Sequence, residues 1–153
     1  MEEKDKKIIQ KTTEELLKIL AIDGSFDVLA NEEEETADVI LDTKDSGIVI
    51  GYHGNMLESL QIILSLCISK RLGKFVRVSM EVGNYRKNRA DWLKNLALQI
   101  KEKALEQNRE IPISNLKPWE RRIIHLLLQE DKEVTSESEG EDRDRILIVK
   151  PKA

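Results

Sequence analysis

Two glycines separated by two residues, Gly51 and Gly54, constrain the fold of this chain more than any other feature. They lie between the apolar segment 48–50 and a second apolar segment that begins at Leu57. Glycine accepts backbone conformations closed to other residues, so this spacing predicts a tight turn between two helices. Such a turn exposes the first amide groups of the second helix, where the helix dipole favours phosphate. The alternative is a plain helix-turn-helix corner without a ligand.

The segment after Gly54 has the clearest helical pattern in the first half of the chain. Its apolar residues recur at three-four spacing, Asn55 is suited to cap the helix with Glu58, and Gly73 is suited to end it. Residues 76–82 then alternate between apolar and polar side chains, which predicts a strand buried on one face. The apolar face of the helix is formed by Leu57, Leu60, Leu64, Cys67 and Ile68.

The segment before Gly51 is predicted to contain a helix, a hairpin and a second, shorter helix. Residues 14–22 form an amphipathic helix stopped at Asp23-Gly24, and residues 25–30 and 36–41 pair across an acidic turn. Residues 42–46 offer caps for a short helix that runs into Gly51. The chain up to Val82 is therefore expected to be one compact unit.

The chain from Gly83 onward is predicted to form a second unit. A helical pattern continues to about residue 108, followed by a brief strand at 111–114 and a helix that starts near Pro118. Residues 134–139 and 145–150 then form a hairpin. We expect an α+β fold with two small domains: residues 1–10 as an N-terminal flank, 11–82 as the first domain and 83–153 as the second.

Composition restricts the class of protein. The chain has 153 residues, enough for two small cores, and the start Met1-Glu2-Glu3 does not resemble a secretory signal. The longest uncharged run, 59–69, is about half the length that a bilayer span requires. The single cysteine, Cys67, is interpreted as a small core residue, and one cysteine excludes a disulfide or a zinc-thiolate scaffold. We therefore expect a cytoplasmic protein.

The charge distribution is informative because the net charge of −4 would by itself argue against nucleic-acid binding. Between Cys67 and Lys103 there are ten basic residues and three acidic ones, whereas acids dominate residues 32–35 and 130–144. A basic stretch of this kind is suited to a phosphate backbone. The alternative is that these charges only keep the surface solvated. The ten basic residues are Lys70, Arg71, Lys74, Arg77, Arg86, Lys87, Arg89, Lys94, Lys101 and Lys103.

A second candidate site lies on the predicted helix after Pro118. Arg121 and His125 are four residues apart, so they project from one face of that helix, and Lys117 extends the same row. Guanidinium can hold phosphate through two donors, and imidazole can bond phosphate or stack on a base. We include the adjacent Arg122 in this site. Alternatively, Arg121 pairs with the acids of 137–142 and His125 covers the helix flank, while Trp119 is interpreted as a core anchor.

Several motifs together resemble a known bacterial family. Residues 49–61 are similar to the Ile-Gly-x-x-Gly turn and following helix of type II KH domains. The later motifs resemble the Jag family, also called SpoIIIJ-associated proteins, and the resemblance extends from about residue 11 over nearly the whole chain. These later motifs are Asn84-Tyr85-Arg86, the segment from Pro118 to His125, and Thr135 to Gly140 with Arg145.

The resemblance implies a KH domain followed by an R-three-H domain, which is named for an arginine and a histidine separated by three residues. It implies a KH order of α-β-β-α-α-β and a small antiparallel sheet with two helices in the second domain. By this resemblance, Gly51, Tyr52, His53 and Gly54 form the KH loop, which clamps about four nucleotides of single strand, and Arg121 and His125 form the matching pair. Because Tyr52 and His53 replace the usual basic residue, electrostatic binding should be weaker and stacking should compensate.

The resemblance also implies partners: single-stranded RNA, with single-stranded DNA as an alternative, and a small single-KH-domain protein. It implies a role in controlling cell elongation, division or envelope processes. The strand 75–82 and the long helix after it both offer surfaces for a homo-oligomer, and the sequence does not choose between them.

Two other classes of function are alternatives to RNA binding. An enzyme, such as a phosphodiesterase, is disfavoured because the sequence has no acidic cluster with metal-ligand spacing and no nucleophile beside a base. We therefore predict no catalytic residue, no metal and no cofactor. A protein-interaction scaffold with a degenerate KH loop is the stronger alternative. Salt dependence distinguishes the two, because phosphate-backbone binding weakens steeply as salt rises.

Overall fold

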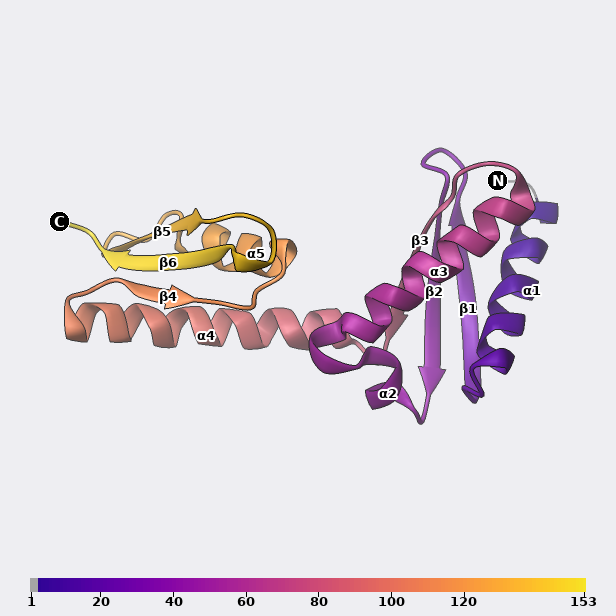
Figure 1. Cartoon of the computed structure of the whole chain (residues 1–153), viewed down its shortest axis with the longest axis horizontal. Helices are drawn as coiled ribbons and strands as arrows, with labels where there is room; N and C mark the ends of the chain where they lie inside the picture. The colour runs from indigo at the N-terminus through magenta and orange to yellow at the C-terminus, as the bar shows by residue number, and fades with distance from the viewer. Residues whose placement is uncertain (1–2) are drawn as a thin grey trace. The chain divides into compact units, whose positions relative to one another are not determined.

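The structure is a computed structural model that describes residues 3–153, and the chain divides after Tyr85 into two compact units (Figure 1). Both units combine helices with a small three-stranded sheet, so the predicted α+β class is confirmed. The domain limits expected from the sequence, 11–82 and 83–153, stay a prediction. Met1 and Glu2 lie outside the described residues. They are part of the acidic start that does not resemble a secretory signal.

The first unit contains three main helices, one short helical turn and three strands. The order in the chain is α1 (Glu3–Ile19), β1 (Gly24–Asn31), β2 (Thr36–Thr43), α2 (Ser46–Ile50), the 3-10 turn Tyr52–Gly54, α3 (Asn55–Leu72) and β3 (Arg77–Val82). This matches the order α-β-β-α-α-β that was expected. In the sheet, β2 lies between β1, which is antiparallel to it, and β3, which is parallel to it.

Helices cover one face of this first sheet. Along β2, Ala37, Val39 and Leu41 are buried while the residues between them are exposed, as the alternation of side chains in a strand requires. α1 packs on β1 and on α3, and α3 packs on β3, which Figure 1 shows as two helices beside the strands. The core between helices and sheet includes Ile9 and Leu64. β3 is an edge strand, which leaves one side of it open.

The first helix is longer than predicted. α1 begins at Glu3, whereas the sequence pattern placed its start at Glu14 and assigned 1–10 to a flank. Residues 3–10 therefore continue the helix, and Ile9 among them is fully buried in the core, while the domain limits themselves stay a prediction. Thr12 and Thr13 interrupt the apolar pattern of this helix in the sequence. Both are nevertheless buried, because their hydroxyls donate to the carbonyls of Ile8 and Ile9.

The second unit is built on a long helix. α4 (Tyr85–Gln107) is followed by β4 (Ile111–Ile113), α5 (Pro118–Leu128), β5 (Val134–Glu139), a 3-10 turn at Asp142–Asp144 and β6 (Ile146–Pro151). β6 lies in the middle of the antiparallel sheet, between β4 and β5. Its buried residues Leu147 and Val149 share a core with Leu93 and Ala97 of α4 and Ile124 of α5.

Asp131 ties the turn between α5 and β5 to the long helix. One carboxylate oxygen lies 2.7 Å from Nζ of Lys101, and the other accepts the backbone amides of Glu133 and Val134 at 2.8 and 3.1 Å. The hydrogen bond from Lys101 is the main reason that the pKa of Asp131 lies below its usual value of 3.8. The same bond holds the pKa of Lys101 above its usual value of 10.5.

Asp131 is therefore expected to stabilise the second unit in a pH-dependent way. A lowered carboxyl pKa contributes stability above the unfolded pKa, and this contribution is lost as pH falls through the lower folded value. Asp131→Asn should reduce the free energy of unfolding by about 1–2 kcal/mol at neutral pH. The difference between the two proteins should shrink in acid below pH 3.8. Urea unfolding followed by tryptophan fluorescence measures this, because Trp92 and Trp119 both lie in the second unit. An equal difference at both pH values would contradict it.

Candidate nucleic-acid interface

The two glycines of the predicted loop are both required by the packing around them. α2 ends where the amide of Gly51 donates to the carbonyl of Gly47, and Gly51 has a φ of 70°. A Cβ at Gly51 would lie 2.7 Å from Cβ of Met56, and one at Gly54 would lie 2.8 Å from Cε1 of Tyr85. Gly54 is buried and also left-handed, with a φ of 76°. The turn therefore has no room for a side chain at either glycine position.

The two residues between the glycines form an exposed aromatic pair. The rings of Tyr52 and His53 are stacked, with centroids 3.9 Å apart and planes 20° apart. His53 adopts a left-handed backbone conformation, with a φ of 51°, and Tyr52 is 75% exposed. α3 starts at Asn55, after Gly54, and the amide of Asn55 already donates to the carbonyl of Tyr52, so only the amides after it can be the open donors of this helix start. Gly54, not Asn55, precedes α3 as its cap residue, so the predicted Asn55 cap is wrong. The loop offers stacking surface beside amide donors.

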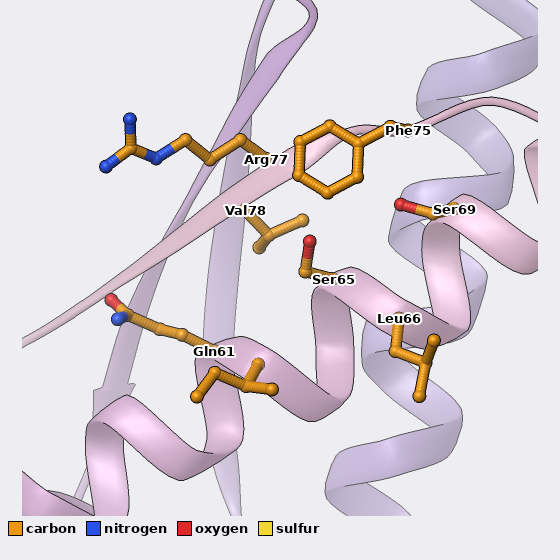
Figure 2. Close-up of a pocket in the computed structure, with 8 residues that line it drawn as sticks. Gln61, Ser65, Leu66, Ser69, Phe75, Arg77 and Val78 are labelled. Carbon is orange, nitrogen blue, oxygen red and sulfur yellow. The ribbon is translucent and has the colours of Figure 1, made fainter.

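A groove lies between α3 and the edge strand β3, and the sequence did not predict it (Figure 2). It has a volume of about 430 Å³ and is mostly apolar in character. Ile62, Leu66 and Phe75 are 69%, 66% and 73% exposed. Figure 2 shows Phe75 and Arg77 on the strand side, and Gln61 and Ser65 on the helix side. The residues that line it are Gln61, Ile62, Ser65, Leu66, Ser69, Phe75, Arg77 and Val78.

Polar side chains fix the width of this groove. The amide of Met80 donates to Oε1 of Gln61 at 2.8 Å, and the hydroxyl of Ser65 donates to the carbonyl of Val76 at 2.6 Å. Ser69 bonds both the amide and the carbonyl of Val76. α3 carries apolar residues on more than one side, whereas a surface helix of a globular protein usually has a single apolar stripe. Here that pattern reflects one core face and one groove face, and Cys67 is only half-buried.

In the second unit, Arg121 lies in a different environment from the one predicted. It is only 9% exposed, and its Nη1 donates to the carbonyl of Leu116 at 2.7 Å. The alternative of a surface arginine that pairs with the acids of 137–142 is therefore wrong. Arg121 lies on the buried side of the helix, and its guanidinium supports the chain where it enters α5. Trp119 is half-buried against the core, in agreement with the anchor interpretation.

The other predicted residues of this site remain accessible. His125 is exposed, and its Nδ1 lies 2.8 Å from the hydroxyl of Ser136 on β5, which orients the ring. Arg122 is exposed on α5, and Lys117 is half-buried just before the helix. The structure thus brings Lys117, Arg122 and His125 onto the surface of one helix and its entry, with Arg121 beneath them. Contact of these residues with a ligand stays a prediction.

A buried ion pair supports this helix, and the sequence analysis missed it. Nε of Arg89 on α4 lies 2.7 Å from Oε2 of Glu120, and the two side chains are 10% and 0% exposed. The other oxygen of Glu120 accepts the amide of Lys117 at 3.2 Å. Arg89 also lies over the ring of Trp92, with 4.3 Å between Cζ and the ring centroid. Because 31 residues separate the partners, no local pattern could have indicated the pair.

The described part of the chain, residues 3–153, contains no cluster of three or more histidine, cysteine, aspartate or glutamate side chains able to hold a metal ion. Over the same residues, no helix combines the length and apolar character that crossing a bilayer would require.

Comparison with known proteins assigns both units to families. The family model of the KhpA/KhpB KH domain matches residues 6–80, and that of the R-three-H domain matches residues 91–151. The fold, the glycine loop and the arginine-histidine helix therefore define a protein in which a KH domain precedes an R-three-H domain. The chain belongs to the KhpB family, also known as the Jag family, as its motifs indicated.

Similar proteins come from several bacteria. The chain is 38% identical to a protein named RNA-binding protein KhpB from Clostridium symbiosum, over 85% of this chain and 58% of that protein. It is 30% identical to the protein of the same name from Streptococcus pneumoniae serotype 2, over 93% of this chain and 44% of that protein. For the Bacillus subtilis protein of that name, the identity is 27% over 86% and 64%. The chain spans about half the length of the curated relatives it matches.

Proposed function

We propose that this chain binds single-stranded RNA and acts as a regulatory protein without catalysis or cofactor. The observation that carries the proposal is the position of the loop Gly51–Gly54, with its stacked Tyr52 and His53, at the start of the helix that forms one wall of the groove. A phosphate at the first amides of α3 would leave the adjacent bases beside exposed aromatic and apolar surface. The name of the relatives, RNA-binding protein KhpB, agrees with this proposal.

Each part of the first surface has a distinct task in the proposal. The loop amides would hold phosphate, which compensates for the missing basic residue between the glycines. The exposed rings of Tyr52 and His53 would stack on a base, and Phe75, Ile62 and Leu66 would cover further bases along the groove. Arg77 at the strand side would supply charge to the backbone. This surface would accept RNA or DNA single strands, because no base-specific donor set is required for stacking.

The second surface would lie on α5. Arg122 and Lys117 would contact phosphate, and His125, oriented by Ser136, would bond phosphate or stack on a base. Arg121 would act mainly by holding the start of the helix in position, since its guanidinium is bonded to the Leu116 carbonyl. The two surfaces would let one chain engage two parts of a single strand.

The physiological role is proposed on the family resemblance. We propose that the protein acts in the cytoplasm, that it pairs with a small single-KH-domain protein or with itself, and that it controls cell elongation, division or envelope processes. The open edge of β3 in the first unit supports a protein partner, because an edge strand presents unpaired backbone groups.

The loop is tested by a double variant, Tyr52→Asp with His53→Asp. Two carboxylates at the proposed phosphate site should weaken binding of a short single-stranded RNA pool about tenfold or more, because they repel phosphate and remove the stacking rings. Fluorescence anisotropy across a salt series measures both the affinity and its salt slope. The native affinity should fall steeply as salt rises.

A matched control adds the same two negative charges elsewhere in the first unit. Gln10→Glu with Ser25→Asp changes exposed residues on α1 and β1, and it should leave the affinity nearly unchanged. Equal weakening by both double variants would show a general charge effect and would remove the loop from the site. If the loop variant still binds the RNA pool, RNA binding would be assigned to the α5 surface. No binding by the native chain at any salt would contradict the proposal and favour a protein scaffold.

A further inference from the structure

An uncharged row of exposed side chains lies on α4 outside both surfaces described above. Its members, which we call the α4 amide row, are spaced by three or four residues and therefore share one face of the helix. All four are exposed, and Trp92 is 50% exposed. The row consists of Asn88, Trp92, Asn95 and Gln99. In a chain with 35% charged residues, such a row is unusual enough to require an explanation.

Packing does not explain the tryptophan. The face of α4 that enters the core carries Leu93, Ala97 and Ala104, all fully buried. Trp92 lies beside this face and keeps half of its surface in solvent. The free energy from burying an indole is therefore only partly gained in this position. The part of the side chain that stays in solvent is available to a ligand.

The indole contacts an arginine that is itself held in a buried ion pair. The guanidinium of Arg89 lies over the ring at 4.3 Å from its centroid. Arg89 is itself fixed, because its Nε is 2.7 Å from the fully buried Glu120. A cation against an aromatic ring is a favourable contact, so it stabilises the indole in this position. A ring held in this way loses little conformational entropy when a flat ligand stacks on it.

The neighbours of the indole indicate the ligand. Asparagine and glutamine carry both a donor and an acceptor, which is the pattern needed to bond the edge of a nucleobase. Lys87 and Lys94 are exposed on the same helix and would attract a phosphate backbone. A protein partner is disfavoured, because a row with one apolar residue and three amides can bury little apolar area.

We propose that Trp92 is a base-stacking site of the second unit, on which one nucleobase of a single-stranded RNA lies while Asn88 and Asn95 bond its edge. The inference rests on the proposed RNA binding and deepens it. It adds a site that neither the glycine loop nor the arginine-histidine helix includes. Glu120 connects it to the α5 surface, because its two oxygens bond Arg89 and the amide of Lys117.

The test compares Trp92→Ala with the native chain on two probes, an oligouridine and an abasic oligonucleotide of the same length and charge. Loss of one stacked base should weaken oligouridine binding about tenfold. Binding of the abasic strand should not change, and the salt slope should stay the same because no phosphate contact is removed. Leu98→Ala is the matched control, since Leu98 is a 52% exposed apolar residue of the same helix outside the row.

A second variant gives a direct readout of stacking. Trp92→Phe should keep most of the affinity, because phenylalanine can still stack on a base. In the native chain, bound RNA should quench tryptophan fluorescence, and in Trp92→Phe the remaining Trp119 should show little quenching. Circular dichroism of each variant confirms that the fold is retained.

Each of the remaining outcomes overturns the inference in a recognisable way. If the native chain binds oligouridine but Trp92→Ala binds equally well, the stacking site is wrong while the proposed RNA binding stands. If Trp92→Ala weakens the abasic strand equally, the residue acts on the structure rather than on a base. If Trp92→Ala changes only self-association in sedimentation, the row contacts a second copy of the chain. If the native chain binds no RNA, both proposals fail.

Discussion

Replacing Glu120 with alanine is expected to lower the free energy of unfolding of the second unit by about 3–5 kcal/mol. Glu120 is fully buried, and its partner Arg89 is 10% exposed, so the substitution leaves a buried guanidinium without its carboxylate. It also removes the acceptor for the amide of Lys117 at the start of α5. Urea unfolding followed by tryptophan fluorescence measures the effect.

A double-mutant cycle separates the ion pair from other causes. Removing both charges, as Arg89→Ala with Glu120→Ala, should destabilise the unit less than Glu120→Ala alone, because no unpaired buried charge is then left. Glu120→Gln, which keeps an acceptor for Lys117, should lie between the native protein and Glu120→Ala. If the double variant were as unstable as the two single losses added together, the pair would not be the source of the effect.

Gly54→Ala is the second substitution with a large expected effect, about 2–4 kcal/mol on the first unit. The backbone at Gly54 is left-handed, which is unfavourable for alanine. In addition, the new Cβ would lie 2.8 to 3.1 Å from three atoms of the Tyr85 side chain, which packs against the core. Hydrogen exchange of the first unit measures the loss, since this unit contains no tryptophan.

Gly73→Ala is the matched control for the backbone part of that effect. Gly73 has a similar left-handed conformation, with a φ of 72°, but a Cβ there would meet no atom within 4 Å. It should therefore cost only about 1 kcal/mol. The difference between the two variants measures the conflict with Tyr85. Equal losses would mean that the ring moves aside freely and that the close packing of the turn has little energetic weight.

Periodicity predicted most of the elements because each one obeys a local rule. The alternation of residues 76–82 and the three-four spacing after Gly54 correspond to β3 and α3, and the glycine turn lies between α2 and α3. α1 was predicted too short because Thr12 and Thr13 satisfy their hydroxyls within the helix and thus occupy buried positions. In the sequence, a buried polar residue whose side chain hydrogen-bonds a carbonyl of its own helix cannot be distinguished from a polar surface residue.

The candidate site was less predictable, because its geometry depends on contacts between distant segments. From the sequence, Arg121 is expected to be a surface residue. In the structure its guanidinium donates a hydrogen bond to the carbonyl of Leu116. The groove could not be predicted, since Ile62 and Leu66 have the same chemistry as Leu64, which is fully buried. Only the position of β3 at the edge of the sheet decides which side of α3 remains open.

The order of strands in the second sheet has a consequence for synthesis. Chains are made from the N-terminus, and domains fold as their residues become available. The first unit has all three of its strands once Val82 has been made. In the second unit the central strand, β6 (Ile146–Pro151), is also the last, so β4 and β5 have no sheet partner until it emerges from the ribosome. A nascent chain halted in the turn at Asp142–Asp144 would therefore carry a complete glycine loop before its α5 surface has formed.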